Sequence, residues 1–411
     1  MLELQTNLKQ RSDYTHKFNV NAGRYGWLRL TPAYSVKMVE EIISRYESNL
    51  KVLDPFCGTG TTALSAIYYA HMSTTVDINP FLVWLAQVKT AHYSDNVLET
   101  TLNRGKQIVD LVKSKSIEAA TEPSIYKIER WWCKEAREFL CFLKGAIIHA
   151  EPAVNQISNL LKIAFCRTLI EISNVAFNHQ SMSFKDEVHA NINYDFEQIF
   201  FDNLSFVVNG ARDNPSSEAG VILGDSRNLH NVLATKFDLV ITSPPYANRM
   251  SYIRELRPYM YWLGYLANGK DAGILDWSAI GGTWGIATSR LMEWKRDKNF
   301  WFPRKLNGTL KLIANGENAN GKLLAQYVEK YCSDMILHFY SLRQVLNEGA
   351  RVHYIVGNST FYGNLVATEQ IYAEILKELK FIDVEVTAVR KRNSKKELFE
   401  FDVSATWPGP G

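Results

Sequence analysis

The stretch KVLDPFCGTGTT, residues 51–62, decides the fold class of this 411-residue chain. Its apolar beginning predicts a short strand, and the glycines at positions 58 and 60 predict a tight turn. Small apolar residues continue to position 70 and predict a helix. A glycine-rich turn between a strand and a helix lets backbone N–H groups approach a ligand closely, so this turn is a candidate binding site.

Strands and helices alternate on both sides of this turn. Further strands are predicted at residues 73–76, 221–223, 237–242, 350–356 and 382–389. Further helices are predicted at residues 32–46, 80–90, 324–346 and 368–379. Because such alternation is typical of parallel sheets, we expect an α/β fold built on a doubly wound, Rossmann-like sheet.

Two segments interrupt this alternation. Residues 95–215 show long helical patterns and carry 13 Lys/Arg against 16 Asp/Glu, so we expect a helical insert that is no broad phosphate-binding surface. Residues 247–323 begin a basic stretch, with 13 Lys/Arg against 7 Asp/Glu between 247 and 330. Half of the ten tryptophans lie there: Trp262, Trp277, Trp284, Trp294 and Trp301. Basic and aromatic residues together favour binding of a nucleic acid, and a solvated face over a tryptophan-rich core is the alternative.

The overall composition excludes several classes of protein. With 46% hydrophobic and 22% charged residues, the chain has the composition of a globular protein and not of a disordered or fibrous one. Its five cysteines are scattered without paired Cys/His spacing, which argues against a disulfide framework and a zinc site and favours a reducing, cytoplasmic compartment. No apolar run is long enough for a bilayer span, so a membrane function is disfavoured.

Carboxylates stand at the ends of the first two predicted strands. Asp54 ends the first, and Asp77 ends the second. A carboxylate at the second position can accept both ribose hydroxyls of an adenosine-containing cofactor, a geometry that nicotinamide enzymes share. However, the turn lacks the third glycine of a pyrophosphate cradle. A cofactor without a pyrophosphate therefore fits better.

Three motifs together resemble a known family. DPFCGTGTT at residues 54–62, VDINP at 76–80 and TSPPY at 242–246 look like those of the S-adenosylmethionine-dependent DNA amino-methyltransferases, and the SPPY form resembles the cytosine-N4 branch. The resemblance covers residues 25–90 and 221–246 and, more weakly, 324–407. It implies methyl transfer from S-adenosylmethionine, without a metal, to the N4 amine of a flipped cytosine in double-stranded DNA. It also implies a prokaryotic restriction-modification system with a separately acting endonuclease.

The resemblance divides the chain and assigns the reacting residues. Residues 1–94, 216–246 and 324–411 would form the catalytic methyltransferase domain, with residues 95–215 as the helical insert and residues 247–323 as a candidate DNA target-recognition insert. The catalytic residues would be Ser243, Pro244, Pro245 and Tyr246. The serine hydroxyl and the Pro244 carbonyl would accept hydrogen bonds from the amine, the prolines would fix the backbone, and the tyrosine would stack on the base.

The cofactor would contact the residues of the glycine turn and the ends of three strands. Asp54 would hold the methionine end, Asp77 the ribose and Asp225 the adenine amine, while Thr31 and Pro32, with Tyr34, would close the methionine side. The complete predicted set is Thr31, Pro32, Asp54, Pro55, Phe56, Cys57, Gly58, Thr59, Gly60, Thr61, Thr62, Asp77, Ile78, Asn79, Asp225 and Ser226.

Several alternatives stay open at this point. The same tetrapeptide can present the N6 amine of adenine, and DPFCGTG also resembles tRNA guanine-N2 methyltransferases. A nucleic-acid-binding module on an inactive scaffold is a further possibility. Asp77 could be a helix N-cap, Asp225 a turn former, and Cys57 could be mistaken for a nucleophile. All readings of the site require that the glycine turn and the double proline lie side by side on one rim.

Overall fold

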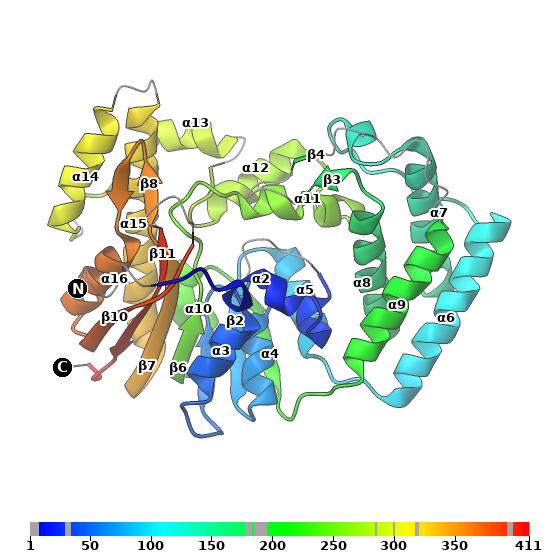
Figure 1. Cartoon of the computed structure of the whole chain (residues 1–411), viewed down its shortest axis with the longest axis horizontal. Coiled ribbons are helices and arrows are strands. Elements are labelled where there is room, and N and C mark those ends of the chain that lie inside the picture. Colours follow the sequence, from blue (N-terminus) through cyan, green and yellow to red (C-terminus); the bar gives the residue numbers. More distant parts are fainter. Residues whose placement is uncertain are drawn as a thin grey trace.

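A seven-stranded sheet forms the centre of the protein, with the order β10-β11-β7-β6-β1-β2-β5 (Figure 1). The computed structural model describes residues 8–28, 34–176, 183–184, 195–283, 286–298, 301–316, 320–392 and 398–410. The strands are β1 (Lys51–Asp54), β2 (Met72–Asp77), β5 (Ala219–Leu223), β6 (Phe237–Thr242), β7 (Leu346–Gly357), β10 (Ile382–Lys391) and β11 (Phe399–Thr406).

Five neighbouring strands, from β5 to β7, run parallel, and β11 and β10 complete the sheet in antiparallel pairing. From β1 the chain extends to β2 and β5 on one side, and it then returns to β6 on the other side of β1. The strand order therefore reverses between β1 and β6. In open α/β sheets, ligands bind beside such a switch point, at the carboxyl ends of the strands.

Helices cover both faces of the sheet, as the alternation predicts. Val52 of β1 packs in a cluster with α3 (Val36–Ile43) and α4 (Thr61–Tyr68). Its neighbour Leu53 packs in another cluster, with α15 (Gly321–Leu342) and α16 (Thr368–Glu378). Successive side chains of a strand point to opposite faces, so the two clusters lie on opposite sides of one sheet. The predicted α/β, Rossmann-like fold is confirmed.

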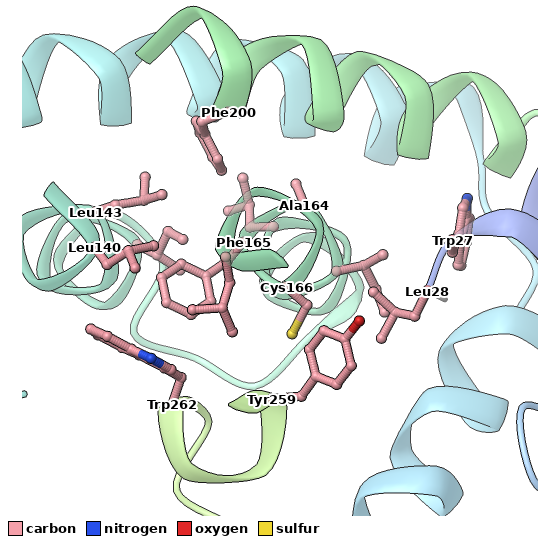
Figure 2. Packing of buried hydrophobic residues seen from close by; sticks show 14 of the residues in the cluster. Trp27, Leu28, Leu140, Leu143, Ala164, Phe165, Cys166, Phe200, Tyr259 and Trp262 are labelled. Carbon is pink, nitrogen blue, oxygen red and sulfur yellow. The ribbon is translucent and has the colours of Figure 1, made fainter. Parts of the chain in front are cut away.

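Four long helices between residues 95 and 211 lie beside the sheet (Figure 1). These are α6 (Asp95–Ser114), α7 (Lys134–Ala150), α8 (Gln156–Glu171) and α9 (Phe196–Ala211). Leu140, Phe165 and Phe200 meet in their common apolar core, which Trp27 borders from the N-terminal part of the chain (Figure 2). α5 (Pro80–Thr90) packs between this core and the sheet.

The basic, tryptophan-rich segment does not form a separate unit. Its first helix, α11 (Tyr252–Trp262), inserts Trp262 into the core of the helical insert, where the indole meets the edges of Trp132 and Phe165 at centroid distances of 5.8 and 5.9 Å (Figure 2). Trp262 is fully buried and cannot stack on a base. The helices α12 (Gly269–Ser278), α13 (Ile286–Glu293) and α14 (Arg304–Ala314) follow, and the last two pack against α15. Trp284 lies outside the described residues.

Short elements complete the fold. They are η1 (Ser12–Tyr14), α2 (His16–Asn19), η2 (Gly23–Gly26), η3 (Ile128–Arg130), β3 (Val175–Ala176), β4 (Ser183–Phe184), η4 (Ser226–Asn228), α10 (Leu229–Val232), η5 (Arg343–Val345), β8 (Ser359–Phe361) and β9 (Asn364–Val366). Within the described ranges, no helix has the length and apolar character that crossing a bilayer requires.

Candidate active site

The glycine turn joins β1 to α4 and adopts a backbone that needs its glycines. Gly58 and Gly60 have φ angles of 52° and 75°, in the left-handed region that disfavours side chains. A Cβ on Gly60 would lie 3.1 Å from the Cβ of Ala86 in α5. Lys89, fully buried behind the turn, donates a hydrogen bond of 3.0 Å to the carbonyl of Thr59, and burial lowers the pKa of its ammonium group to about 7. These contacts fix the turn before any ligand binds.

Asp54 connects the glycine turn to the end of β6. Its Oδ1 accepts a hydrogen bond of 2.6 Å from the hydroxyl of Thr242 and one of 3.1 Å from the amide of Phe56. Its Oδ2 is buried with no hydrogen-bond partner among the residues the structure describes. Burial raises the pKa of this carboxyl to about 6. Because Thr242 directly precedes Ser243, Asp54 holds the two predicted motifs in register.

Asp77, at the end of β2, holds the other side of the turn. Its Oδ2 accepts a hydrogen bond of 2.9 Å from the amide of Gly58, and its Oδ1 accepts one of 2.9 Å from the amide of Asn79. Burial raises its pKa to about 6. The helix that follows is capped by the side chain of Asn79, which accepts from the amide of Phe81. Asp77 is therefore not the N-cap of that helix.

Asp225, after β5, lies in a partly buried ionic network. The guanidinium of Arg227 donates to both of its carboxylate oxygens, at 2.9 and 2.7 Å, and also to Asp334 at 3.1 Å. Burial acts to raise the pKa of Asp225, but the hydrogen bonds from Arg227 outweigh it and hold the pKa below its ordinary value. Asp225 also caps η4, so it forms a turn as well as facing the pocket described below.

The double proline follows β6 and is fixed by a side chain of α15. The hydroxyl of Tyr331 in α15 donates a hydrogen bond of 2.8 Å to the carbonyl of Pro245. Ser243 donates to the hydroxyl of Tyr246 over 3.5 Å, and that hydroxyl donates to Glu400 of β11 at 2.7 Å. Arg390 pairs with the same carboxylate at 2.7 Å. The proton of Ser243 thus points toward Tyr246, and the proton of Tyr246 points toward Glu400.

The glycine turn and the double proline line one pocket at the carboxyl ends of the strands, which we call the cofactor pocket. The predicted residues that line it are Pro55, Phe56, Cys57, Gly58, Thr59, Thr61, Asp77, Ile78, Asn79, Asp225, Ser226, Ser243 and Pro245. Tyr34, which is expected on the methionine side, also lines the pocket. The lining residues that the sequence did not single out are Leu82, Gly224, Tyr252, Ile253, Ser278, Ala279 and Ile280. The predicted neighbourhood of the two motifs is therefore present.

Some predicted residues do not line this pocket. Asp54, Gly60, Thr62 and Pro244 are absent from its lining, although Asp54 and Thr62 bond to the end of β6. Tyr246 lines a neighbouring pocket. Thr31 and Pro32 lie outside the described residues.

The chemistry of the lining suits S-adenosylmethionine. Asp77 and Asp225 are its charged side chains, so the pocket is acidic and favours a cationic ligand. The unpartnered Oδ2 of Asp54 is a further acceptor close behind the turn. Burial raises the pKa of the Cys57 thiol well above its ordinary value, so this cysteine is protonated at neutral pH and is no nucleophile. Within the described ranges, no three His, Cys, Asp or Glu side chains are grouped as metal ligands.

Comparison with known proteins agrees with this geometry. Residues 29–262 match the UPF0020 family, described as an RMKL-like methyltransferase domain. The chain belongs to this family. The matched segment of this methyltransferase includes both the glycine turn and the double proline.

The methyltransferase is also similar to three curated proteins along most of their lengths. It is 21% identical to the type II methyltransferase M.BsoBI of Geobacillus stearothermophilus, over 97% of this chain and 86% of that protein. It is 22% identical to the type II methyltransferase M.AvaI of Anabaena variabilis, over 92% and 84%. It is 21% identical to the type II methyltransferase M.MvaI of Kocuria varians, over 91% and 83%. Among solved structures, the rRNA methyltransferase aviRa from Streptomyces viridochromogenes aligns with 12% identity and a TM-score of 0.30, over 92% of this chain and 89% of that chain.

Proposed function

We propose that this methyltransferase transfers a methyl group from S-adenosylmethionine to the exocyclic N4 amine of cytosine at a specific site in double-stranded DNA. The observation that carries the proposal is the shared pocket, which Gly58, Ser243 and Pro245 line together. The type II methyltransferases to which the chain is similar along nearly its whole length support DNA as the substrate. As the modification enzyme of a type II system, it would act separately from its cognate endonuclease.

S-adenosylmethionine, when bound, supplies an electrophilic methyl group on a positively charged sulfur. Asp77 is placed to accept hydrogen bonds from the ribose hydroxyls, since each of its oxygens uses one lone pair on a backbone amide and keeps another. Asp225 is held ionised by Arg227, so it can only accept, which suits the amine of adenine. The turn around Gly58, which lines the pocket, would take the methionine portion, with Asp54 holding the turn from behind.

Ser243 is prepared to accept a hydrogen bond from the target amine. Its own proton is donated to Tyr246, whose proton is donated in turn to Glu400, so the lone pairs of the serine remain for the substrate. The Pro244 carbonyl would accept the second amine proton, and the hydrogen bond from Tyr331 to Pro245 holds the elbow that presents it. Two such acceptors favour a pyramidal amine whose lone pair can attack the methyl group. Most of the acceleration then comes from positioning.

Tyr246 would stack on the flipped cytosine. Its hydroxyl is tied to Glu400, so the plane of the ring is set before the base arrives. Taking the base out of the duplex costs a few kcal/mol. Stacking of the base on an aromatic side chain contributes about 1–3 kcal/mol and so offsets much of this cost.

The domain division follows from the same reading. All seven strands of the main sheet fall within residues 1–94, 216–246 and 324–411, which we propose as the catalytic domain, with 95–215 as the helical insert. We propose that residues 247–323 read the DNA target. Because α11 packs into the helical core, the DNA-facing part of this segment would begin after Trp262, in α12 to α14.

The test is to incubate the purified protein with labelled S-adenosylmethionine and either duplex DNA or tRNA, and to identify the methylated nucleoside by mass spectrometry. We expect label in DNA as N4-methylcytosine. Detection of N6-methyladenine instead would show that adenine is the methylated base, and label in tRNA alone would refute the assignment of DNA as the substrate. Cofactor binding without any transfer would indicate a binding module on an inactive scaffold.

A further inference from the structure

A second pocket adjoins the cofactor pocket on the side of Tyr246. We call it the arm pocket, because the N-terminal arm, residues 8–19, forms one of its walls. It is lined by Gln10, Arg11, Ser12, Thr15, His16, Lys17, Tyr34, Tyr246, Asn248, Met250, Tyr252, Arg390, Arg392 and Glu400. Tyr34 and Tyr252 line both pockets. A molecule in the arm pocket would therefore reach the place where the methyl group is transferred.

The two pockets have opposite charge. The cofactor pocket is lined by two carboxylates, Asp77 and Asp225, and by no Lys or Arg. The lining of the arm pocket contains four Lys or Arg side chains against the single carboxylate of Glu400. A pair of adjoining pockets with this charge pattern suits a cation on one side and an anion on the other.

The N-terminal arm is fixed in place at both of its ends. The carbonyl of Lys9 accepts a hydrogen bond of 3.3 Å from the amide of Lys391, at the end of β10. Asn19 donates to the carbonyl of Tyr34 at 3.0 Å and accepts from the amide of Val36 at 2.9 Å. In Figure 1 the arm runs from the β10–β11 side of the sheet to α2. It is thus a preformed wall of the arm pocket.

Two of the four basic groups are already paired within the protein. Arg390 is bonded to Glu400, and Arg11 is bonded to Asp13, both at 2.7 Å. In the described part of the chain, no ion pair is formed by Lys17, which is exposed. Arg392 donates a hydrogen bond of 2.9 Å to the carbonyl of Asn358, and its guanidinium lies 5.0 Å from the ring centroid of Tyr246. Lys17 and Arg392 therefore keep positive charge to offer to a ligand.

Gly357 makes the position of Arg392 possible. A Cβ on this glycine would lie 2.2 Å from a guanidinium nitrogen of Arg392 and 2.9 Å from the ring of Tyr246. Arg392 is consequently held beside the ring on which the target base would stack, and it lines the arm pocket.

We propose that the arm pocket binds the phosphodiester backbone of the DNA strand that carries the flipped nucleotide, with Lys17 and Arg392 each neutralising one phosphate next to that nucleotide. This inference rests on the proposed function, since it presumes a DNA substrate. In the proposed function, the target base stacks on the face of Tyr246 beside Ser243. The phosphates on either side of that nucleotide would then lie toward the N-terminal arm, so the anion in the arm pocket would be a backbone phosphate.

The test compares Lys17→Gln and Arg392→Gln with the wild type and with Lys106→Gln, a control on the exposed face of α6, which lies at the opposite end of the molecule (Figure 1). Binding to an unmethylated duplex that contains the site which the enzyme methylates is measured by fluorescence anisotropy between 50 and 200 mM NaCl. Each phosphate contact contributes about 0.9 to the slope of log K against log salt, so the advantage of the wild type over each variant should shrink about 3.5-fold across this range. Lys106→Gln should match the wild type.

A second duplex carries neutral methylphosphonates on both sides of the target nucleotide. On this duplex the wild type and both variants should bind equally, because the charge that Lys17 and Arg392 contact is gone. Equal salt slopes for the wild type and Lys17→Gln on the normal duplex would overturn the inference, and so would a variant defect that persists on the methylphosphonate duplex. Lys17 is exposed, so its substitution leaves the fold intact. If this inference fails while the wild type still methylates DNA, the proposed function stands.

Discussion

Asp77→Ala should weaken cofactor binding far more than it slows the chemical step. The carboxylate of Asp77 accepts two backbone hydrogen bonds of 2.9 Å, from Gly58 and Asn79, and so holds the turn in its binding conformation. Hydrogen bonds to charged groups contribute about 1.5–3 kcal/mol each. Loss of both, together with the acceptor for the ribose, corresponds to at least about 3 kcal/mol, or about a hundredfold in dissociation constant.

Asp77→Asn separates geometry from charge. Its single amide oxygen can accept one of the two backbone bonds, while its NH2 group opposes the other N–H, so we expect about a tenfold loss of affinity. Dissociation constants for S-adenosylhomocysteine are measured by calorimetry, and turnover is measured at saturating S-adenosylmethionine. Asp110→Ala, at an exposed position of α6, is the control. A dissociation constant within twofold of the wild type, with turnover lost instead, would refute this role for Asp77.

Four further predictions follow from the site and the core. Ser243→Ala should lower kcat about a hundredfold with unchanged affinity for S-adenosylhomocysteine, because an acceptor for the amine is lost; a matching loss of cofactor affinity would contradict the assignment. Tyr246→Phe keeps the ring but breaks the link to Glu400, so kcat should fall about tenfold, and unchanged kcat would show that the orientation of the serine proton is unimportant. Burial raises the pKa of Asp54 and of Asp77 to about 6, so both carboxyl groups are ionised at pH 8. Cofactor affinity should therefore fall as the pH drops below 6, by about tenfold per pH unit for each carboxylate that binding requires. Titration calorimetry between pH 5 and 8 measures this dependence, and an affinity that does not change with pH would contradict it. Trp262→Ala should lower the free energy of unfolding by about 3–5 kcal/mol in urea denaturation, and full stability with lost DNA affinity would instead place this indole on the DNA.

The centre of the fold was readable because its signals are local. β1 and β6 have the predicted bounds, and α5 spans the predicted residues 80–90. Each of these elements is a short apolar run whose end is marked by a proline, a glycine or a polar cap. The glycine turn and the double proline could be placed together because parallel strands bring their carboxyl ends to one edge.

The parts that sequence reasoning missed depend on contacts between distant segments. β11 was not predicted, although Phe399, Phe401, Val403 and Ala405 alternate with polar residues in the period of a strand. Glu400 belongs to this strand and was therefore not predicted as a site residue. Its contact with Tyr246 joins residues 154 positions apart in the sequence. The basic, tryptophan-rich composition also gave no sign that Trp262 belongs to the core of the helical insert, because composition does not report burial.

The arm pocket was missed for a similar reason. Its walls come from the first 34 residues, from the segment after β6 and from the β10–β11 edge, and no single motif contains more than a few of them. Residues 390–392 lie in the part of the chain where the family resemblance is weaker, and the structure alone shows that Arg390 and Arg392 line a pocket with Lys17 and Tyr246.

The methylated base itself is the most direct test of the central claim. Genomic DNA from cells with and without this gene is sequenced by a method that detects modified bases, which reports the base and the recognition site together. The account predicts N4-methylcytosine at one short sequence, present only with the intact gene and lost in the Ser243→Ala variant. The same sequence carrying N6-methyladenine, or no difference between the two DNAs, would contradict it.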